Sequence, residues 1–166
     1  MIRDLAVPGD LLFYRVTPSS SFNSRIIAIL ELLRGEGEGP IQYSHVAILD
    51  EDIDTRIEAV WPKVRSSKVD WNDPRLELWR RPMEASQAAV VTRVAWEHIG
   101  DWYDLWGMVF GWRESSHSEY CTTLVVKVFD RIGVRLGVEA GKILTPNELL
   151  EDSTIQFVGQ VSDALR

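Results

Sequence analysis

Runs typical of β-strands come first along this chain and runs typical of α-helices come later, and this order limits the folds it can adopt. Short apolar runs bounded by turn residues predict strands, and apolar positions three and four residues apart predict helices. Strands are predicted at residues 11–16, 43–49, 56–61, 64–69, 76–80 and 154–161, and helices at 24–34, 86–99, 105–110, 118 to about 133 and 146–151. Segregated strands and helices favour an α+β fold with an antiparallel sheet over a doubly wound parallel sheet.

The length and charge of the chain exclude several functional classes. Its 166 residues are enough for one domain, 1–166, with a substantial core. A net charge of −7, from 18 basic and 25 acidic residues, argues against a general binder of nucleic acid or anionic membranes. The N-terminal sequence MIRDLAVPGD lacks the apolar run of a signal peptide, and no stretch is apolar enough to span a membrane. We therefore expect a cytoplasmic protein, with release by another route left open.

The only cysteine lies near the start of the helix predicted from residue 118. Ser118 is the expected N-cap, and Cys121 in the first turn points the same way as the buried stripe of that helix. The stripe comprises Leu124, Val125, Val128, Phe129 and Ile132. A thiol at a helix N-terminus lies where its thiolate form is favoured. Free cysteines are also among the most buried residues, so a plain core cysteine is the alternative interpretation.

Two predicted strands, on either side of the acidic turn at residues 50–54, carry a possible base and its partner. His45 lies near the start of the first strand, and Glu58 lies in the second. A tight turn centred on residues 51–52 places the two residues directly opposite each other. A turn two residues longer leaves them diagonal on one face, and a shift of one residue separates them. A carboxylate beside an imidazole stabilises its protonated form, as a base paired with a thiol requires, although both residues also suit a half-exposed structural face.

The other two histidines are weaker candidates for a base. His98, late in a helix and next to Glu97, suits a surface or C-cap position. His117 lies four residues before Cys121, and a base so close in sequence does not usually reach across to the thiol. One cysteine and three scattered histidines lack the spacing of a metal site. We therefore expect no metal and no cofactor.

The order of several short motifs resembles the circularly permuted branch of the NlpC-type papain-like cysteine hydrolases, which is related to the lecithin retinol acyltransferases. The motifs are PGD before the first strand, SHVAI with His45, EAV with Glu58, Tyr103-Asp104, YCTTLVVKVF with Cys121, and Leu144-Thr145-Pro146. The resemblance runs from about residue 7 to about residue 161. Two features depart from the pattern: Thr122 stands where serine is more usual, and GEGEGP at residues 35–40 is an insertion.

This resemblance implies a papain-like, partly barrel-like antiparallel sheet packed against helices. It also implies that Cys121 is the nucleophile, His45 the general base and Glu58 the orienting group, with the backbone N–H of Cys121 in the oxyanion hole. The candidate substrate contacts are aromatic: Tyr43, Trp61, Tyr103 and Tyr120. Trp61, Trp102 and Trp106 are also candidates for cleft walls, although a core position is the more common one for tryptophan.

The expected activity is hydrolysis of amide bonds through an acyl-enzyme, in small peptides of the peptidoglycan type. A second hypothesis is hydrolysis or acyl transfer on lipid amides or esters. The amphipathic helical stretch at residues 26–33 would then contact a membrane without stable insertion. A third is a non-catalytic binding module that retains the fold. The sequence leaves the oligomeric state and the role of the loop at 35–40 open.

Overall fold

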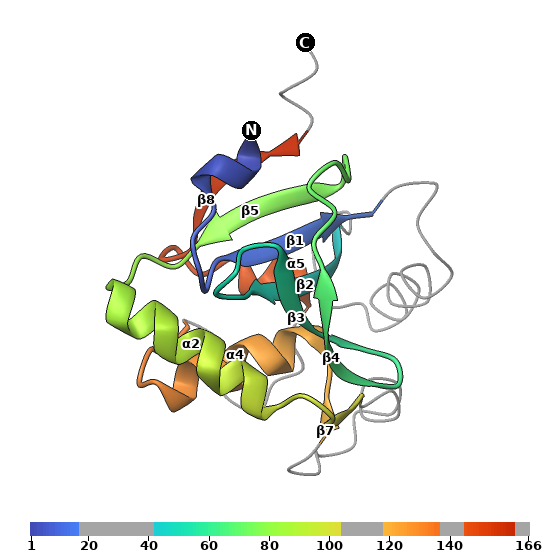
Figure 1. The fold of residues 1–166 in the computed structure, drawn as a ribbon, viewed down its shortest axis with the longest axis vertical. Coiled ribbons are helices and arrows are strands. Elements are labelled where there is room, and N and C mark those ends of the chain that lie inside the picture. The colour runs from blue at the N-terminus through green and yellow to red at the C-terminus, as the bar shows by residue number, and fades with distance from the viewer. Residues whose placement is uncertain (17–41, 104–117, 137–144, 162–166) are drawn as a thin grey trace.

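The computed structural model describes residues 1–16, 42–103, 118–136 and 145–161, which form a sheet with helices against it (Figure 1). The strands are β1 (Leu11–Arg15), β2 (Tyr43–Leu49), β3 (Thr55–Val60), β4 (Lys63–Lys68), β5 (Leu76–Arg80), β6 (Trp102–Tyr103), β7 (Ser118–Glu119) and β8 (Gln156–Gln160). The helices are the 3-10 turn η1 (Ile2–Leu5), α2 (Ala85–Glu97), α4 (Cys121–Arg131) and α5 (Pro146–Leu149). Helices α2 and α4 lie side by side on one side of the sheet (Figure 1).

The strands form a single mixed sheet within the described part of the chain, in the order β7-β6-β4-β3-β2-β1-β5-β8. Each pair of neighbouring strands in this order is antiparallel except β7 and β6, which are parallel. The predicted α+β fold with an antiparallel sheet is therefore confirmed. Strands β7 and β8 end the sheet and do not pair with each other in the described residues, so the expected barrel-like closure is not observed.

The sheet separates two apolar clusters, and β2 contributes to both. Val46 and Ile48 belong to the larger cluster, which includes the buried stripe of α4 and residues of α2. Ala47 and Leu49 belong to the smaller cluster on the opposite face, which includes Ile2 of η1. A strand buried on both faces reads as a continuous apolar run rather than an alternating one. This accounts for the run VAIL in β2.

Helix α4 begins at Cys121, one residue after its N-cap, Tyr120. The expected cap at Ser118 is wrong, because Ser118 and Glu119 instead form β7 and pair with β6. Most of the predicted stripe is fully buried, namely Leu124, Val125, Val128 and Phe129, and Ile132 is half-buried at the C-cap. The helix therefore presents its first residue, Cys121, at the end that meets the sheet.

The remaining predicted elements lie within two residues of their observed bounds. Helix α5 begins as expected at Thr145, whose hydroxyl accepts a hydrogen bond from the backbone N–H of Glu148 at 3.1 Å. The Glu148 carboxylate accepts in turn from the N–H of Thr145 at 2.7 Å, as in a capping box. The two-residue strands β6 and β7 were not expected, since their sequence is too short for a periodic pattern. The segments at 24–34, 35–40 and 105–110 lie outside the described residues.

The turn between β2 and β3 is two residues longer than the tight turn considered first. Ile48 pairs with Ile57 and Leu49 with Arg56. Asp52 holds the longer turn, because its carboxylate accepts hydrogen bonds from the backbone N–H of Thr55 at 2.8 Å and of Asp54 at 3.0 Å. Ile53 adopts a positive φ of 50° inside the turn. The longer of the two turns left open by the sequence is therefore the one observed.

None of the helices within the described ranges is both long and apolar enough to cross a membrane.

The packing of α4 predicts a large cost for truncating its stripe. Leu124 is fully buried, so Leu124→Ala should reduce the free energy of unfolding by about 2–5 kcal/mol through lost contacts and a residual cavity. Asp130→Ala, on the exposed side of the same helix, should change it by less than about 0.5 kcal/mol. Urea unfolding followed by tryptophan fluorescence measures both, and equal effects would contradict this packing.

Candidate active site

His45 and Glu58 lie on one face of the sheet, as diagonal neighbours. The register of β2 and β3 places Glu58 across from Ala47, two residues along from His45. His45 Nε2 is 2.9 Å from Glu58 Oε2, and the two side chains are 16% and 2% exposed. The sequence left three registers open, and the observed one keeps these residues together.

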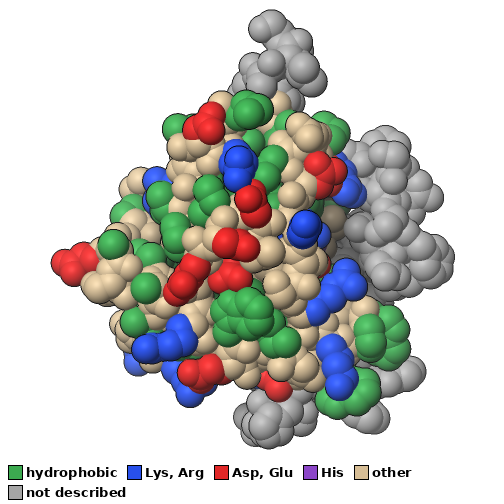
Figure 2. Space-filling view, in the orientation of Figure 1, with side chains coloured by type: hydrophobic (Ala, Val, Ile, Leu, Met, Phe, Trp, Pro, Cys, Tyr) green, Lys and Arg blue, Asp and Glu red, His purple; other side chains and the backbone are tan. Residues whose placement is uncertain are grey.

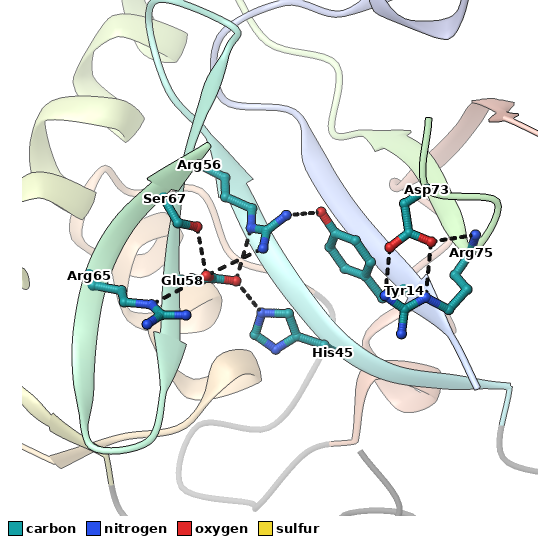
Figure 3. Close-up of polar contacts among 8 residues, drawn as sticks. All are labelled: Tyr14, His45, Arg56, Glu58, Arg65, Ser67, Asp73 and Arg75. Carbon is teal, nitrogen blue, oxygen red and sulfur yellow. Dashed lines mark hydrogen bonds and ion pairs between the residues drawn. The ribbon is translucent and has the colours of Figure 1, made fainter. Parts of the chain in front are cut away.

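The Glu58 carboxylate is buried among donors from three strands (Figure 3). Besides His45, Arg56 Nε donates to Oε2 at 2.9 Å and the Ser67 hydroxyl donates to Oε1 at 2.7 Å. Arg65 Nε lies 3.6 Å from Oε1. A buried carboxylate is costly unless it is paired and hydrogen-bonded. Both oxygens of Glu58 meet that requirement.

These contacts fix the charge states of the pair. Burial alone would raise the pKa of Glu58, but the hydrogen bond and charge of His45, the charge of Arg56 and the Ser67 hydroxyl hold it well below its ordinary value. Burial alone would lower the pKa of His45, but hydrogen bonds with Cys121 and Glu58, and the negative charge of each, raise it to about 9. The site therefore favours an imidazolium next to a carboxylate at neutral pH.

The Cys121 side chain acts on the His45 imidazole, whose pKa it raises through a hydrogen bond and through its charge. Because His45 Nε2 faces Glu58, the ring nitrogen left for the thiol is Nδ1. The first position of α4 places Cys121 at a helix N-terminus, where the dipole favours negative charge. Cys121 is free and buried, so it has the burial expected of a core cysteine, and its role as nucleophile stays a prediction.

A second group of residues, which the sequence analysis missed, supports the pair from β1 (Figure 3). The Tyr14 ring lies 5.8 Å from that of His45, centroid to centroid, and its hydroxyl accepts a hydrogen bond from Arg56. Burial raises the pKa of Tyr14 to about 12, although the charge of Arg56 opposes that shift. Asp73 forms two hydrogen bonds with the Arg75 guanidinium, at 2.9 and 2.6 Å. The sequence did contain a signal for the contact between Arg56 and Glu58, because residues two apart in a strand face the same side of the sheet.

The four expected substrate contacts lie in different surroundings. Tyr43 is buried, and its hydroxyl donates to Glu77 Oε2 at 2.6 Å. Tyr120 is buried at the N-cap of α4. Tyr103 is half-buried against the larger cluster, and Trp61 is exposed. Their contact with a substrate stays a prediction.

Other sequence interpretations have mixed outcomes. Trp61 and Trp102 are 57% and 59% exposed, so the core position considered more common for them is wrong. Trp102 itself pairs with Lys63 between β6 and β4, and Trp61 lies two residues before Lys63. His98 is the C-cap of α2, as predicted, and its Nδ1 lies 3.0 Å from Asp101 Oδ2. His117 and Trp106 lie outside the described residues.

Comparison with known proteins identifies a fold but no family. No family model matches the sequence, and no curated protein matches it. The structure is similar to the crystal structure of metalloprotein yiiX from Escherichia coli O157:H7, described as DUF1105, with a TM-score of 0.68 and 17% sequence identity. The match covers 94% of this chain and 98% of that chain. At this identity the likeness establishes a shared fold alone.

This comparison corrects the family resemblance inferred from the sequence. The structural neighbour is a DUF1105 protein, a family different from the NlpC-type papain-like hydrolases and the lecithin retinol acyltransferases. The motifs behind that resemblance are short, and they describe a turn, a strand and a helix start that many α+β proteins share. The assignment to the permuted papain-like branch is therefore wrong, and the site has to be argued from its own geometry.

The charge state of the pair predicts an unusual histidine titration. In an NMR titration, His45 should titrate near pH 9 rather than at its ordinary 6.5. Because the folded-state pKa is raised, the imidazolium stabilises the fold fully below about pH 6.5, and that contribution is lost as the pH rises through about 9. Glu58→Gln should lower the pKa of His45 by removing the negative charge. His45→Gln assigns the resonance, and a ring that titrates at or below 6.5 in the wild type would contradict the geometry.

Proposed function

We propose that this protein is a cysteine hydrolase that cleaves amide bonds through an acyl-enzyme. Cys121 is the nucleophile, His45 the general base and Glu58 the residue that orients and charges the imidazole. The observation that carries the proposal is the contact of the buried Glu58 carboxylate with His45 Nε2, together with the effect of the Cys121 thiol, at the start of α4, on the pKa of the same imidazole. A nucleophile, a base in reach and a third group orienting the base make up the arrangement that nucleophilic catalysis requires.

In this mechanism the thiol proton already lies on the His45 imidazolium, and the Cys121 thiolate attacks the carbonyl carbon of the substrate through Sγ. The carbonyl oxygen becomes an oxyanion, for which the unpaired N–H groups of a first helical turn are natural donors. The backbone N–H of Cys121 is the proposed donor. Collapse of the intermediate breaks the C–N bond, and the leaving amine takes its proton from His45. Water, activated by the same imidazole, then hydrolyses the thioester and restores the thiol.

Glu58 has a positional role in this scheme and does not take the proton. Its pKa lies well below the ordinary value because His45, Arg56 and Ser67 outweigh its burial, so it stays ionised throughout the reaction. An ionised carboxylate on Nε2 holds the ring with Nδ1 toward the sulfur and stabilises the imidazolium as it forms. Arg56 and Ser67 in turn fix the carboxylate.

The structural neighbour is described as a metalloprotein. Whether this site could hold a metal depends on the ligands that it offers and on the charges around them. No group of three or more metal-ligating side chains lies together in the described ranges. The oxygens of Glu58 already accept from Arg56 and Ser67, and two guanidinium groups lie beside them. Cations in those positions oppose the binding of another cation. The described residues of this site therefore do not fit a metal.

Short peptide amides are the first substrates to assay, and lipid amides or esters are the second. The narrower expectation of peptidoglycan-type peptides came from the family resemblance and has no other support. A non-catalytic binding module is the contrasting hypothesis, and it requires Cys121 to behave as an ordinary buried thiol.

Alkylation of Cys121 by iodoacetamide distinguishes these hypotheses without a known substrate. We expect rapid labelling of the wild type near and below neutral pH, and a loss of that reactivity in His45→Ala because the base is removed. His98→Ala, which removes another carboxylate-paired histidine, should leave the rate unchanged. Labelling that follows an ordinary thiol titration, or that requires unfolding, would exclude the catalytic role.

Turnover provides the second measurement. With 4-nitrophenyl acetate, mass spectrometry of the intact protein should detect an acetyl group on the wild type and none on Cys121→Ala. His45→Ala should slow acylation by a factor on the order of 10²–10⁴, the usual contribution of a general base. Acetylation of Cys121→Ala at the wild-type rate would show that the adduct forms on another residue.

A further inference from the structure

Strand β4 places two cations on the sheet face that carries the catalytic pair. Arg65 lies opposite Glu58 and Lys63 lies opposite Val60. Directly opposite residues of an antiparallel pair project from the same face. Lys63 and Arg65 therefore project on the side of Glu58, while Lys68, opposite Thr55, projects on the other side.

The charges around Glu58 leave a positive excess. Its single carboxylate is closely paired with Arg56 at 2.9 Å, whereas Arg65 is 3.6 Å away and its side chain is 61% exposed. Asp73, whose pKa the charge of Arg56 helps to lower, is already paired with Arg75. The exposed guanidinium of Arg65 is distant from Glu58, which is already paired with Arg56. Arg65 can therefore bind a second carboxylate, to which its planar guanidinium is well suited. This local excess contrasts with the net charge of −7 of the chain.

Exposed aromatic rings lie next to these cations. Trp102 pairs with Lys63 across β4 and β6, and Lys63 Nζ lies 4.4 Å from the centroid of its ring. Trp61 lies two residues before Lys63 and is also exposed. Figure 2 shows hydrophobic and basic side chains together over the β3–β4 hairpin. Exposed aromatic and basic residues that cluster in one place are more typical of a binding surface than of the rest of a protein surface.

We propose that Arg65 and Lys63 form a subsite for a substrate carboxylate, with Trp61 and Trp102 contacting the apolar part of the same substrate. The proposal rests on the hydrolase function and narrows it to amides that bear a free carboxylate near the scissile bond, such as acidic peptides. Arg65 is the specificity-determining residue of this subsite, and Lys63 supplies the second positive charge.

The test compares two alkylating reagents of similar size at Cys121, anionic iodoacetate and neutral iodoacetamide. The ratio of their rates reports the electrostatic field at the thiol and cancels changes in thiol reactivity. We expect the wild-type ratio to exceed that of free cysteine and to fall by roughly two- to threefold in Arg65→Gln, as the loss of one nearby charge implies. Lys63→Gln should act in the same direction. Lys68→Gln removes the same charge from the opposite face and should leave the ratio unchanged.

Each outcome separates this proposal from the one on which it rests. A ratio that falls in Arg65→Gln and not in Lys68→Gln, and that decreases with added salt, supports the subsite. A ratio unaffected by Arg65→Gln, with iodoacetamide labelling still dependent on His45, overturns the subsite and leaves the hydrolase intact. Labelling that does not depend on His45, or no labelling by either reagent, overturns both.

Discussion

The buried carboxylate of Glu58 is the constraint on which the rest of the site depends. At 2% exposure it needs compensating donors, and these come from β2, β3 and β4 through His45, Arg56 and Ser67. Each donor is in place only if its strand keeps the observed register. A one-residue slip would turn His45 or Ser67 to the opposite face and leave a buried charge without partners. The electrostatics of the site and the register of the sheet therefore reinforce each other.

That same carboxylate determines what the cysteine can do. A helix N-terminus alone favours a thiolate only modestly, since the dipole effect of an exposed helix end is small. Next to Cys121, however, stands an imidazole whose pKa is about 9, because hydrogen bonds with Cys121 and Glu58 and the charges of both outweigh its burial. The network behind Glu58 reaches β1, where Tyr14 accepts from Arg56 and packs against the His45 ring. The reactive pair is thus held by elements distant in sequence.

The sequence was sufficient for the longer strands, the α4 stripe and the shared face of His45 and Glu58, because hydrophobic periodicity and strand alternation report burial directly. It was insufficient where the outcome depends on individual side chains. The length of the β2–β3 turn follows from hydrogen bonds to Asp52 and a positive φ at Ile53, which no periodicity encodes. Alternation places Arg56 on the face of Glu58 but cannot show which of several cations pairs with it. The exposure of Trp61 likewise depends on its place at a hairpin end.

The failed family resemblance shows why short motifs are weak evidence for chemistry. In PGD, Gly9 adopts a φ of 81°, a backbone conformation that residues with a side chain rarely adopt. Asp10 is buried and accepts from the Arg80 guanidinium at 2.7 and 2.8 Å. These residues are accounted for by the turn before β1 and its attachment to β5, without reference to catalysis. A motif that the fold itself requires can recur wherever that turn recurs. Support for a hydrolase comes instead from Glu58, His45 and Cys121, whose contacts the packing of the sheet alone does not require.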